Sequence, residues 1–218
     1  MRKFENVYIN GTGRFLPNSP VSNDDIDQFI QPINKISGRI KKRILKENGI
    51  QTRYYGIDKE GNTTHSLAEM CSHAVHSCLE KAKFSMEDIE LLATGTVGGD
   101  TAIPGFANML QGYLKAPPME TSTHTGICMS GVVALKHAAY AVDSGDVRRA
   151  MVVAGEFPSR MFKSSRFQDI DYNVDFDAHF LRWMLSDGAG AWALSDRPSP
   201  LGLSFKINFV HTQSFSGD

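Results

Sequence analysis

The segment from Cys128 to Asp143 constrains the fold more than any other, because it has the length of a helix and almost no polar face. Its strongly polar interior positions are Lys136, His137 and Asp143 itself. A helix that is apolar nearly all round is buried inside a domain rather than laid on its surface. The sequence therefore predicts a central helix covered by other layers of secondary structure.

The remainder of the chain alternates segments with the pattern of strands and segments with the pattern of helices. The expected strands are 7–12, 89–97, 119–123, 150–155, 188–195 and 203–210. The expected helices are 22–29, 66–83, 104–114 and 128–143. Such alternation predicts an α/β fold, which we expect to be a mixed five-stranded sheet covered by helices.

Composition excludes several classes of protein. The 218 residues allow one large domain or two small ones. Lys plus Arg number 23 and Asp plus Glu 24, so the net charge of −1 gives no whole-protein case for binding nucleic acid. With 41% hydrophobic and 22% charged residues, the chain has the composition of a soluble globular protein. It contains no apolar run near the roughly 18 residues of a membrane span, and no signal-peptide core near Met1.

The cysteines indicate a reducing, cytoplasmic protein, because three of them cannot all pair. Cys71 and Cys78 are seven residues apart on the helix expected at 66–83, about 10 Å along its axis. That separation is too long for a disulfide, so we expect both to be small buried side chains. His73 and His76 could share a metal, but no third or fourth ligand is near in sequence, and we expect no metal site.

Cys128 differs from the other two cysteines because it stands where a helix begins. Gly126 precedes it and Ser130-Gly131 follow it, so a turn of small residues presents it. Free backbone N–H groups and the positive end of the helix dipole favour a thiolate at such a position. From these residues alone, a reactive nucleophile and a third packed cysteine both remain open.

Motifs spread along almost the whole chain point to one family. In order they are Gly49-Ile50-Gln51-Thr52-Arg53, Leu92-Ala93-Thr94-Gly95-Thr96 followed by Pro104, Gly126-Ile127-Cys128-Met129-Ser130-Gly131, Ser144-Gly145-Asp146 leading into Ala150–Glu156, and Ser186-Asp187-Gly188-Ala189-Gly190-Ala191. Together they resemble the β-ketoacyl-[acyl-carrier-protein] synthase III group of thiolase-fold condensing enzymes. The resemblance implies that residues 1–218 form the N-terminal half of a thiolase-like fold.

The resemblance also implies a ping-pong acyl transfer, of the kind used in fatty-acid or polyketide-type biosynthesis. Cys128 would attack a thioester, hold the acyl group, and pass it to a carbanion made by decarboxylating a malonyl-type thioester. Its backbone N–H would be one donor of the oxyanion hole. No cofactor is implied beyond the substrates, which are coenzyme A or phosphopantetheine thioesters, and an acyl carrier protein is the expected partner.

Ile103 occupies the position at which the family inserts a side chain across a dimer interface into the partner's acyl pocket. This match implies a homodimer whose pocket depth is set partly in trans. Ordinary core packing of Ile103 is the alternative interpretation.

Arg43 stands where the family often has a tryptophan that stacks on the adenine of coenzyme A. It belongs to a cluster of bases, which we call the basic cluster: Arg39, Lys41, Lys42, Arg43 and Lys46. The cluster could dock an acidic carrier protein or bind the phosphates of a pantetheine arm, or it could be a plain solvated helix face. Arg160 matches a family arginine at the mouth of the same tunnel. A carrier-protein thioester therefore gains weight over coenzyme A.

Two departures from the family are evident. The stretch from Met161 to Leu185, with His179 and Trp183, is longer than the family's common form and could reshape the acyl pocket or the dimer surface. We therefore expect a specialised condensing enzyme of the aromatic-lipid or dialkylresorcinol kind.

The second departure is that the family's catalytic histidine and asparagine lie in a second half that this chain does not contain. His211 does not match that histidine, and neither His124 nor His137 is placed to replace it. We expect a fragment, or a subunit paired with a separate C-terminal half. A non-catalytic thiolase-like subunit for dimerisation or carrier docking is the alternative, and thiolase or hydroxymethylglutaryl-synthase chemistry would use the same cysteine.

Overall fold

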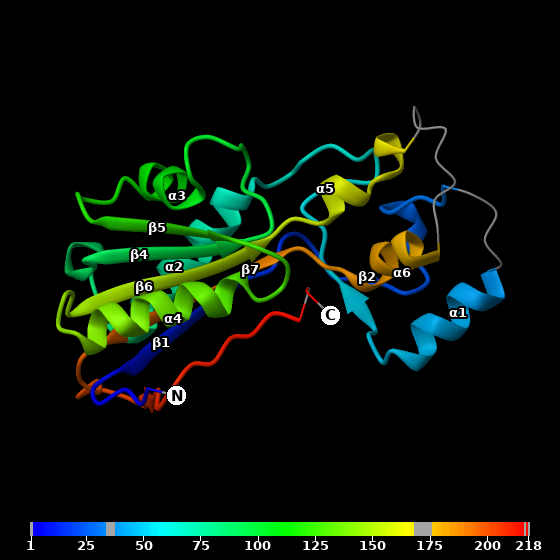
Figure 1. Ribbon diagram of the computed structural model, residues 1–218. Helices are drawn as coiled ribbons and strands as arrows, with labels where there is room; N and C mark the ends of the chain where they lie inside the picture. Colours follow the sequence, from blue (N-terminus) through cyan, green and yellow to red (C-terminus); the bar gives the residue numbers. More distant parts are fainter. Residues whose placement is uncertain (1, 34–37, 168–175, 216, 218) are drawn as a thin grey trace. The chain divides into compact units, whose positions relative to one another are not determined.

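The computed structural model of the protein describes residues 2–33, 38–167, 176–215 and 217. The chain forms two compact units, each assembled from segments that are distant in the sequence (Figure 1). The sheet unit comprises Met1–Phe15, Leu67–Glu156 and Ala189–Asp218, and the second unit comprises Leu16–Ser66 and Phe157–Gly188. None of the helices described has both the length and the apolar character needed to cross a bilayer.

The sheet unit is built on a mixed sheet with the strand order β5-β4-β6-β7-β1-β8. Its strands are β1 (Tyr8–Phe15), β4 (Leu91–Thr96), β5 (Glu120–Thr125), β6 (Arg149–Glu156), β7 (Gly188–Ser195) and β8 (Phe205–Lys206). Strand β4 pairs in parallel with β5 and β6, whereas β1 is antiparallel to β7 and β8. The carboxyl ends of β4, β5 and β6 therefore lie at the same end of the sheet, and β5 and β8 are its two edge strands.

Helices cover both faces of this sheet, as the alternation of side chains along each strand shows. The helices are α2 (Leu67–Ala82), α3 (Phe106–Leu114) and α4 (Ser130–Asp143), with a short 3-10 turn, η2 (Met86–Asp88), after α2. Ala93 of β4 packs with Ala134 and Ala138 of α4 in one apolar cluster. On the opposite face, Thr123 of β5 accepts the N–H of Ala107 from α3 at 2.9 Å. Helices α3 and α4 therefore lie on opposite faces.

The second unit has little regular structure and is held together by buried polar groups. Its elements are β2 (Val21–Ser22), η1 (Ile26–Gln28), α1 (Gly38–Glu47), β3 (Thr52–Arg53), α5 (Ser159–Phe162), η3 (Ser164–Arg166) and α6 (Phe176–Met184). The buried Arg182 of α6 donates to the carbonyl oxygens of Phe162 at 2.8 Å and Gln31 at 2.6 Å. Burial lowers the pKa of Arg182 to about 10, so it remains charged at neutral pH while it joins these segments.

The α/β architecture predicted from the sequence is confirmed, with several changes at the ends of elements. The sheet has six strands rather than five, because the segment expected as a strand at 203–210 joins the same sheet, with Phe205–Lys206 pairing along the free edge of β1. That pairing is all that forms of the strand expected at 203–210. The helix expected at 22–29 is reduced to η1, and the helix expected from Pro104 begins at Phe106 after Gly105.

Helix α4 is buried on one face only, so the expectation of burial all round is wrong for this chain. Ala134 and Ala138 have no exposed surface, but Val132, on another side of the helix, is 38% exposed. The physical reason is that the sheet covers α4 from one side, whereas the further cover among the described residues includes only an extended C-terminal segment, to which Lys136 donates at the hydroxyl of Thr212 at 3.4 Å. An apolar surface is thus left open beside the turn that contains Cys128.

Candidate functional site

Cys128 lies in a tight turn between the end of β5 and the start of α4. The residue is exposed, and its φ of +43° places it in the left-handed region that non-glycine residues seldom occupy. The N–H of Met129 donates to the carbonyl of Ile127, closing the turn around Cys128. A residue held in this way costs about 1–3 kcal/mol, and such residues concentrate at functional sites. The packed-cysteine alternative is therefore wrong for Cys128.

The N-terminus of α4 adds uncapped donors beside this turn. Met129 is the N-cap residue and makes no side-chain cap. The first helical bond is donated by Val133 to the carbonyl of Met129 at 3.0 Å, so the N–H groups of the preceding turn have no partner within the helix. These groups, with the positive end of the helix dipole, favour an anion at the start of α4. The helix begins two residues after the position expected from the sequence, and Cys128 precedes it.

The other two cysteines are chemically different, as expected. Cys71 is fully buried, and burial raises the pKa of its thiol. Cys78 is also buried and donates to the carbonyl of Gly11 at 3.3 Å, and burial raises its pKa to about 12. Both thiols therefore remain protonated at neutral pH.

Ile103 is displayed rather than packed, so the alternative of core packing is wrong. Its side chain is 85% exposed on the loop between β4 and α3. Carboxylates anchor that loop at two points: Asp100 accepts the N–H groups of Leu67 and Ala68 at 2.9 and 2.8 Å, and Glu156 accepts the N–H of Val97 at 2.9 Å. An exposed apolar side chain on an anchored loop is a suitable contact for another chain.

Arg43 and Arg160 both lie in the second unit, whereas Cys128 and Ile103 lie in the sheet unit. Arg43 is exposed on α1 and pairs with Glu47 at 2.7 Å. The guanidinium of Arg160, on α5, lies 5.0 Å from the ring centroid of Phe157. The basic cluster does form a helix, and within it Lys41 pairs with Asp27.

The long stretch Met161–Leu185 folds within the second unit, and its residues 168–175 lie outside the described part of the chain. His179 and Trp183 are both buried on α6, with their rings 5.9 Å apart. This placement accounts for both side chains as packing within the unit. Whether the stretch shapes an acyl pocket stays a prediction.

The histidines near Cys128 in sequence form a separate cluster. The rings of His124 on β5 and His137 on α4 are 5.3 Å apart, and Nε2 of His124 lies 3.1 Å from the hydroxyl of Ser122. Burial, followed by the neighbouring His137, lowers the pKa of His124. His211 is exposed on the C-terminal segment. Among the described residues, no histidine is hydrogen-bonded to the sulfur of Cys128.

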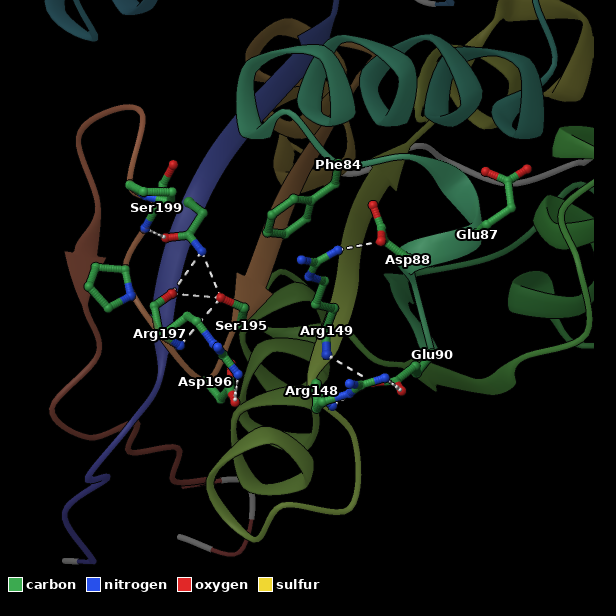
Figure 2. Close-up of a pocket in the computed structure, with 13 residues that line it drawn as sticks. Phe84, Glu87, Asp88, Glu90, Arg148, Arg149, Ser195, Asp196, Arg197 and Ser199 are labelled. Atoms are coloured by element: carbon green, nitrogen blue, oxygen red, sulfur yellow. Dashed lines mark hydrogen bonds and ion pairs between the residues drawn. The ribbon is translucent and has the colours of Figure 1, made fainter.

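A polar pocket of about 430 Å³ lies at the other end of the sheet, where β4 and β6 begin (Figure 2). Its arginines are matched with carboxylates: Arg149 pairs with Asp88, Arg148 with Glu90, and Arg197 with Asp196. Because each guanidinium already faces a carboxylate, the pocket offers no net positive charge to an anionic ligand. The pairs Arg148–Glu90 and Arg149–Asp88 join the start of β6 to the residues before β4, and we assign the pocket a structural role.

Comparison with known proteins identifies enzymes whose sequences are similar to this chain. No family model matches the chain. It is 28% identical over 200 residues to the β-ketoacyl-[acyl-carrier-protein] synthase III of Methylococcus capsulatus, covering 92% of this chain and 55% of the relative. It is 29% identical over 198 residues to the enzyme of the same name from Clostridium novyi, covering 91% and 53%. The chain thus spans about half the length of the curated relatives it matches.

Solved structures of condensing enzymes have the same fold as this chain. The acetamide-bound OleA of Xanthomonas campestris superposes with a TM-score of 0.75 at 21% identity, covering 89% of this chain and 60% of that one. AbyA1, a tetronic acid condensing enzyme, superposes with a TM-score of 0.73 at 21% identity, covering 87% and 54%. The thiolase-like fold expected from the motifs is confirmed, and so is the sequence resemblance to β-ketoacyl-[acyl-carrier-protein] synthase III.

Proposed function

We propose that this chain is the nucleophile-bearing half of a condensing enzyme, and that Cys128 accepts an acyl group from a thioester. The observation that carries the proposal is the exposed cysteine in a left-handed turn, placed before the uncapped N-terminus of α4. A merely packed thiol needs neither the exposure nor the strained backbone. The similarity to synthase III enzymes across 92% of the chain supports the same assignment.

The first half-reaction needs only groups of the kind found around this turn. The thiolate of Cys128 attacks the carbonyl carbon of the donor thioester, and the carbonyl oxygen becomes an oxyanion. Backbone N–H groups at the start of α4, including that of Cys128, are the candidate donors to this oxyanion. As the tetrahedral intermediate collapses, the bond from carbon to the donor sulfur breaks. The donor then leaves as a thiolate and takes a proton from water.

The acyl donor is proposed to be a carrier-protein or coenzyme A thioester, as in the resemblance. Arg43 and the rest of the basic cluster are candidate contacts for an acidic carrier surface, with Arg160 as a further cationic contact. The charge balance of α1 supports this role, because five basic residues face one glutamate within the ten residues Gly38–Glu47. Three cysteines without a disulfide fit the reducing, cytoplasmic compartment in which such donors occur.

We further propose that two copies pair through the side of the sheet unit that carries β5 and Ile103. Strand β5 has a strand neighbour on one side only, so its outer edge carries backbone groups that can pair with another strand. The anchored loop presents Ile103 beside the same sheet edge. In such a pair, Ile103 of one copy would limit the acyl pocket of the other.

Condensation requires more than the acyl-enzyme. The enolate formed on decarboxylation of a malonyl thioester needs donors, and the resemblance assigns these to a histidine and an asparagine that match no residue of this chain. Loss of one such donor typically lowers the rate by about 10²–10³-fold. We therefore propose that the described residues support acyl-enzyme formation and that condensation depends on sequence beyond them.

The test measures both half-reactions on the same sample. The chain is incubated with octanoyl coenzyme A and with malonyl coenzyme A, and carbon dioxide release is followed beside the mass of the protein. We expect a slow gain of one acyl group and no release of carbon dioxide above that of the Cys128→Ala variant. Stoichiometric release of carbon dioxide with formation of a β-ketoacyl product would contradict the proposal that condensation depends on sequence beyond the described residues.

A further inference from the structure

The start of α4 lies against β4 more closely than any side chain would allow. A Cβ atom built on Gly95 of β4 would stand 2.5 Å from the backbone N of Gly131 and 2.5 Å from the carbonyl carbon and oxygen of Ser130. Atoms of this kind do not approach below about 3 Å, and backbone atoms cannot turn aside as the end of a side chain can. Any residue larger than glycine at position 95 would therefore displace the first turn of α4.

A second close approach fixes the same turn from β6. A Cβ atom on Gly131 would stand 2.8 Å from the Cβ of Ala154, and no other neighbouring atom outside the helix's own backbone lies within 4 Å of it. The obstacle is thus a single methyl group. Removing that methyl from Ala154 would leave room for one on Gly131, which gives the contact a clean reciprocal test.

These two contacts bear directly on Cys128. Ser130 and Gly131 are the first two residues of α4, and Ser130 is 97% buried, so the helix is fixed in place at its beginning. The turn that holds Cys128 runs straight into them through Met129, whose N–H closes the turn. A displacement of the first helical turn therefore reaches the strained backbone of Cys128 within three residues.

We propose that Gly95 and Gly131 are positioning residues, whose missing side chains set the place of Cys128 against the N-terminus of α4. Neither glycine contacts a substrate, and each acts through the backbone of the first turn. The acyl-transfer part of this proposal rests on the proposed function, whereas the part that concerns thiol reactivity does not. Displacement of a reacting group by about 1 Å can lower a rate by 10²-fold.

The experiment compares five variants of the full chain: Gly95→Ala, Gly131→Ala, Ala154→Gly, the double variant Gly131→Ala/Ala154→Gly, and Gly112→Ala as a control. Gly112 lies on α3, and a Cβ there meets nothing within 4 Å. Each protein is first melted to establish cooperative unfolding. The rate of alkylation of Cys128 by iodoacetamide is then measured from pH 6 to 9 by peptide mass spectrometry, and acyl transfer from octanoyl coenzyme A is measured separately.

Gly95→Ala and Gly131→Ala are expected to slow alkylation at pH 7 about tenfold, to displace its pH profile to higher pH, and to slow acyl transfer by about 10²-fold. The rates of the double variant should return to within threefold of those of the unchanged chain. The rates of Gly112→Ala should equal those of the unchanged chain. A purely structural role would lower the melting temperature without moving the pH profile.

Two outcomes overturn the proposal: an unchanged alkylation profile in folded Gly95→Ala or Gly131→Ala, or a double variant as slow as Gly131→Ala. Should Gly95→Ala fail to fold, the comparison of Gly131→Ala with the double variant Gly131→Ala/Ala154→Gly decides whether the proposal holds. If the unchanged chain takes up no acyl group, the proposed function fails, and the alkylation profiles still decide the positioning role.

Discussion

Ser159 donates twice to the carboxylate of Asp187, from its hydroxyl to Oδ2 at 2.5 Å and from its backbone N–H to Oδ1 at 3.0 Å. The N–H of Gly56 adds a third bond to Oδ2 at 2.6 Å, and Asp187 is only 1% exposed. One buried carboxylate thus joins the loop after β3, the start of α5 and the approach to β7. Burial raises the pKa of Asp187, and the bond from the Ser159 hydroxyl is the largest effect that opposes the rise.

Replacing Ser159 by Ala should destabilise the protein by about 1.5–3 kcal/mol at pH 8, because a buried carboxylate loses a hydrogen-bond donor. The raised pKa of Asp187 means that its folded form binds a proton more readily than its unfolded form. The loss in Ser159→Ala should therefore shrink as the pH falls and the carboxyl group becomes protonated. Urea unfolding at pH 8 and pH 5 measures both values.

Ser164→Ala is the matched control, because its hydroxyl bonds to Gln31 at the surface at 2.9 Å. It should change the free energy of unfolding by less than about 0.5 kcal/mol at either pH. A loss in Ser159→Ala that is equal at both pH values would show that the carboxylate of Asp187 is not the group affected.

Helix α4 provides a test of one-sided burial. Ala138→Glu places a charge where no surface is exposed, so we expect a loss of several kcal/mol and no folded protein. Val132→Glu lies on the open face of the same helix and should leave a cooperatively melting protein. Circular dichroism melts of the two variants decide the matter. A soluble, cooperatively melting Ala138→Glu protein would contradict the packing of α4 on the sheet.

The case of α4 also shows what the sequence can reveal. Its apolar pattern predicted the helix and its burial, because periodicity records which faces avoid water in the functional assembly. The same pattern could not say that the described chain supplies only one covering layer. Short elements such as β8 and η1 were misjudged because tertiary pairing, and not local propensity, decides their length.

The candidate site could be predicted in part. The glycines around Cys128 and the start of a helix were visible in the sequence, and they located the turn. Its left-handed backbone and the contact of Gly95 with Ser130 depend on the approach of β4 to α4, which no local pattern records. The anchoring of the Ile103 loop by Asp100 was missed for the same reason, since 32 and 33 residues separate that carboxylate from the N–H groups it accepts.

The charge pairs of the polar pocket should make the protein sensitive to acid. The backbone N–H of Arg148 lowers the pKa of Glu90, and the guanidinium of Arg197 lowers that of Asp196. A carboxylate whose folded pKa is depressed stabilises the protein above its unfolded pKa, and this contribution is lost as pH falls through the folded value. Stability should therefore decline from pH 6 to pH 3.

Glu90→Gln tests the largest of these contacts, because Glu90 accepts the N–H groups of Arg148 at 2.5 Å and Arg149 at 3.2 Å. The variant should lose no more than about 1 kcal/mol at pH 6, because partly exposed pairs are screened. Its difference from the unchanged chain should shrink as the pH falls from 6 to 3. Glu87→Gln, on the same pocket, is the control and should be neutral. A Glu90→Gln difference that is as large at pH 3 as at pH 6 would contradict this assignment.

The three thiols should differ strongly in reactivity. Cys128 is exposed beside a helix N-terminus, whereas burial raises the pKa of Cys71 and Cys78. Brief iodoacetamide treatment of folded protein should label Cys128 at least about 10²-fold faster than either. Peptide mass spectrometry with and without urea provides the comparison. Labelling first at Cys71 or Cys78 in the folded protein would show that the turn does not present a reactive sulfur.

Cys128 is proposed to accept the acyl group, and the mass of the peptide that contains Cys128 tests this role most directly. The chain is exposed to acyl thioesters of coenzyme A and of a carrier protein, digested at low pH, and compared with Cys128→Ser. We expect one acyl mass on the Cys128 peptide, removed by hydroxylamine and absent from Cys71 and Cys78. An unmodified Cys128 peptide, in protein whose Cys128 still alkylates rapidly, would contradict the account.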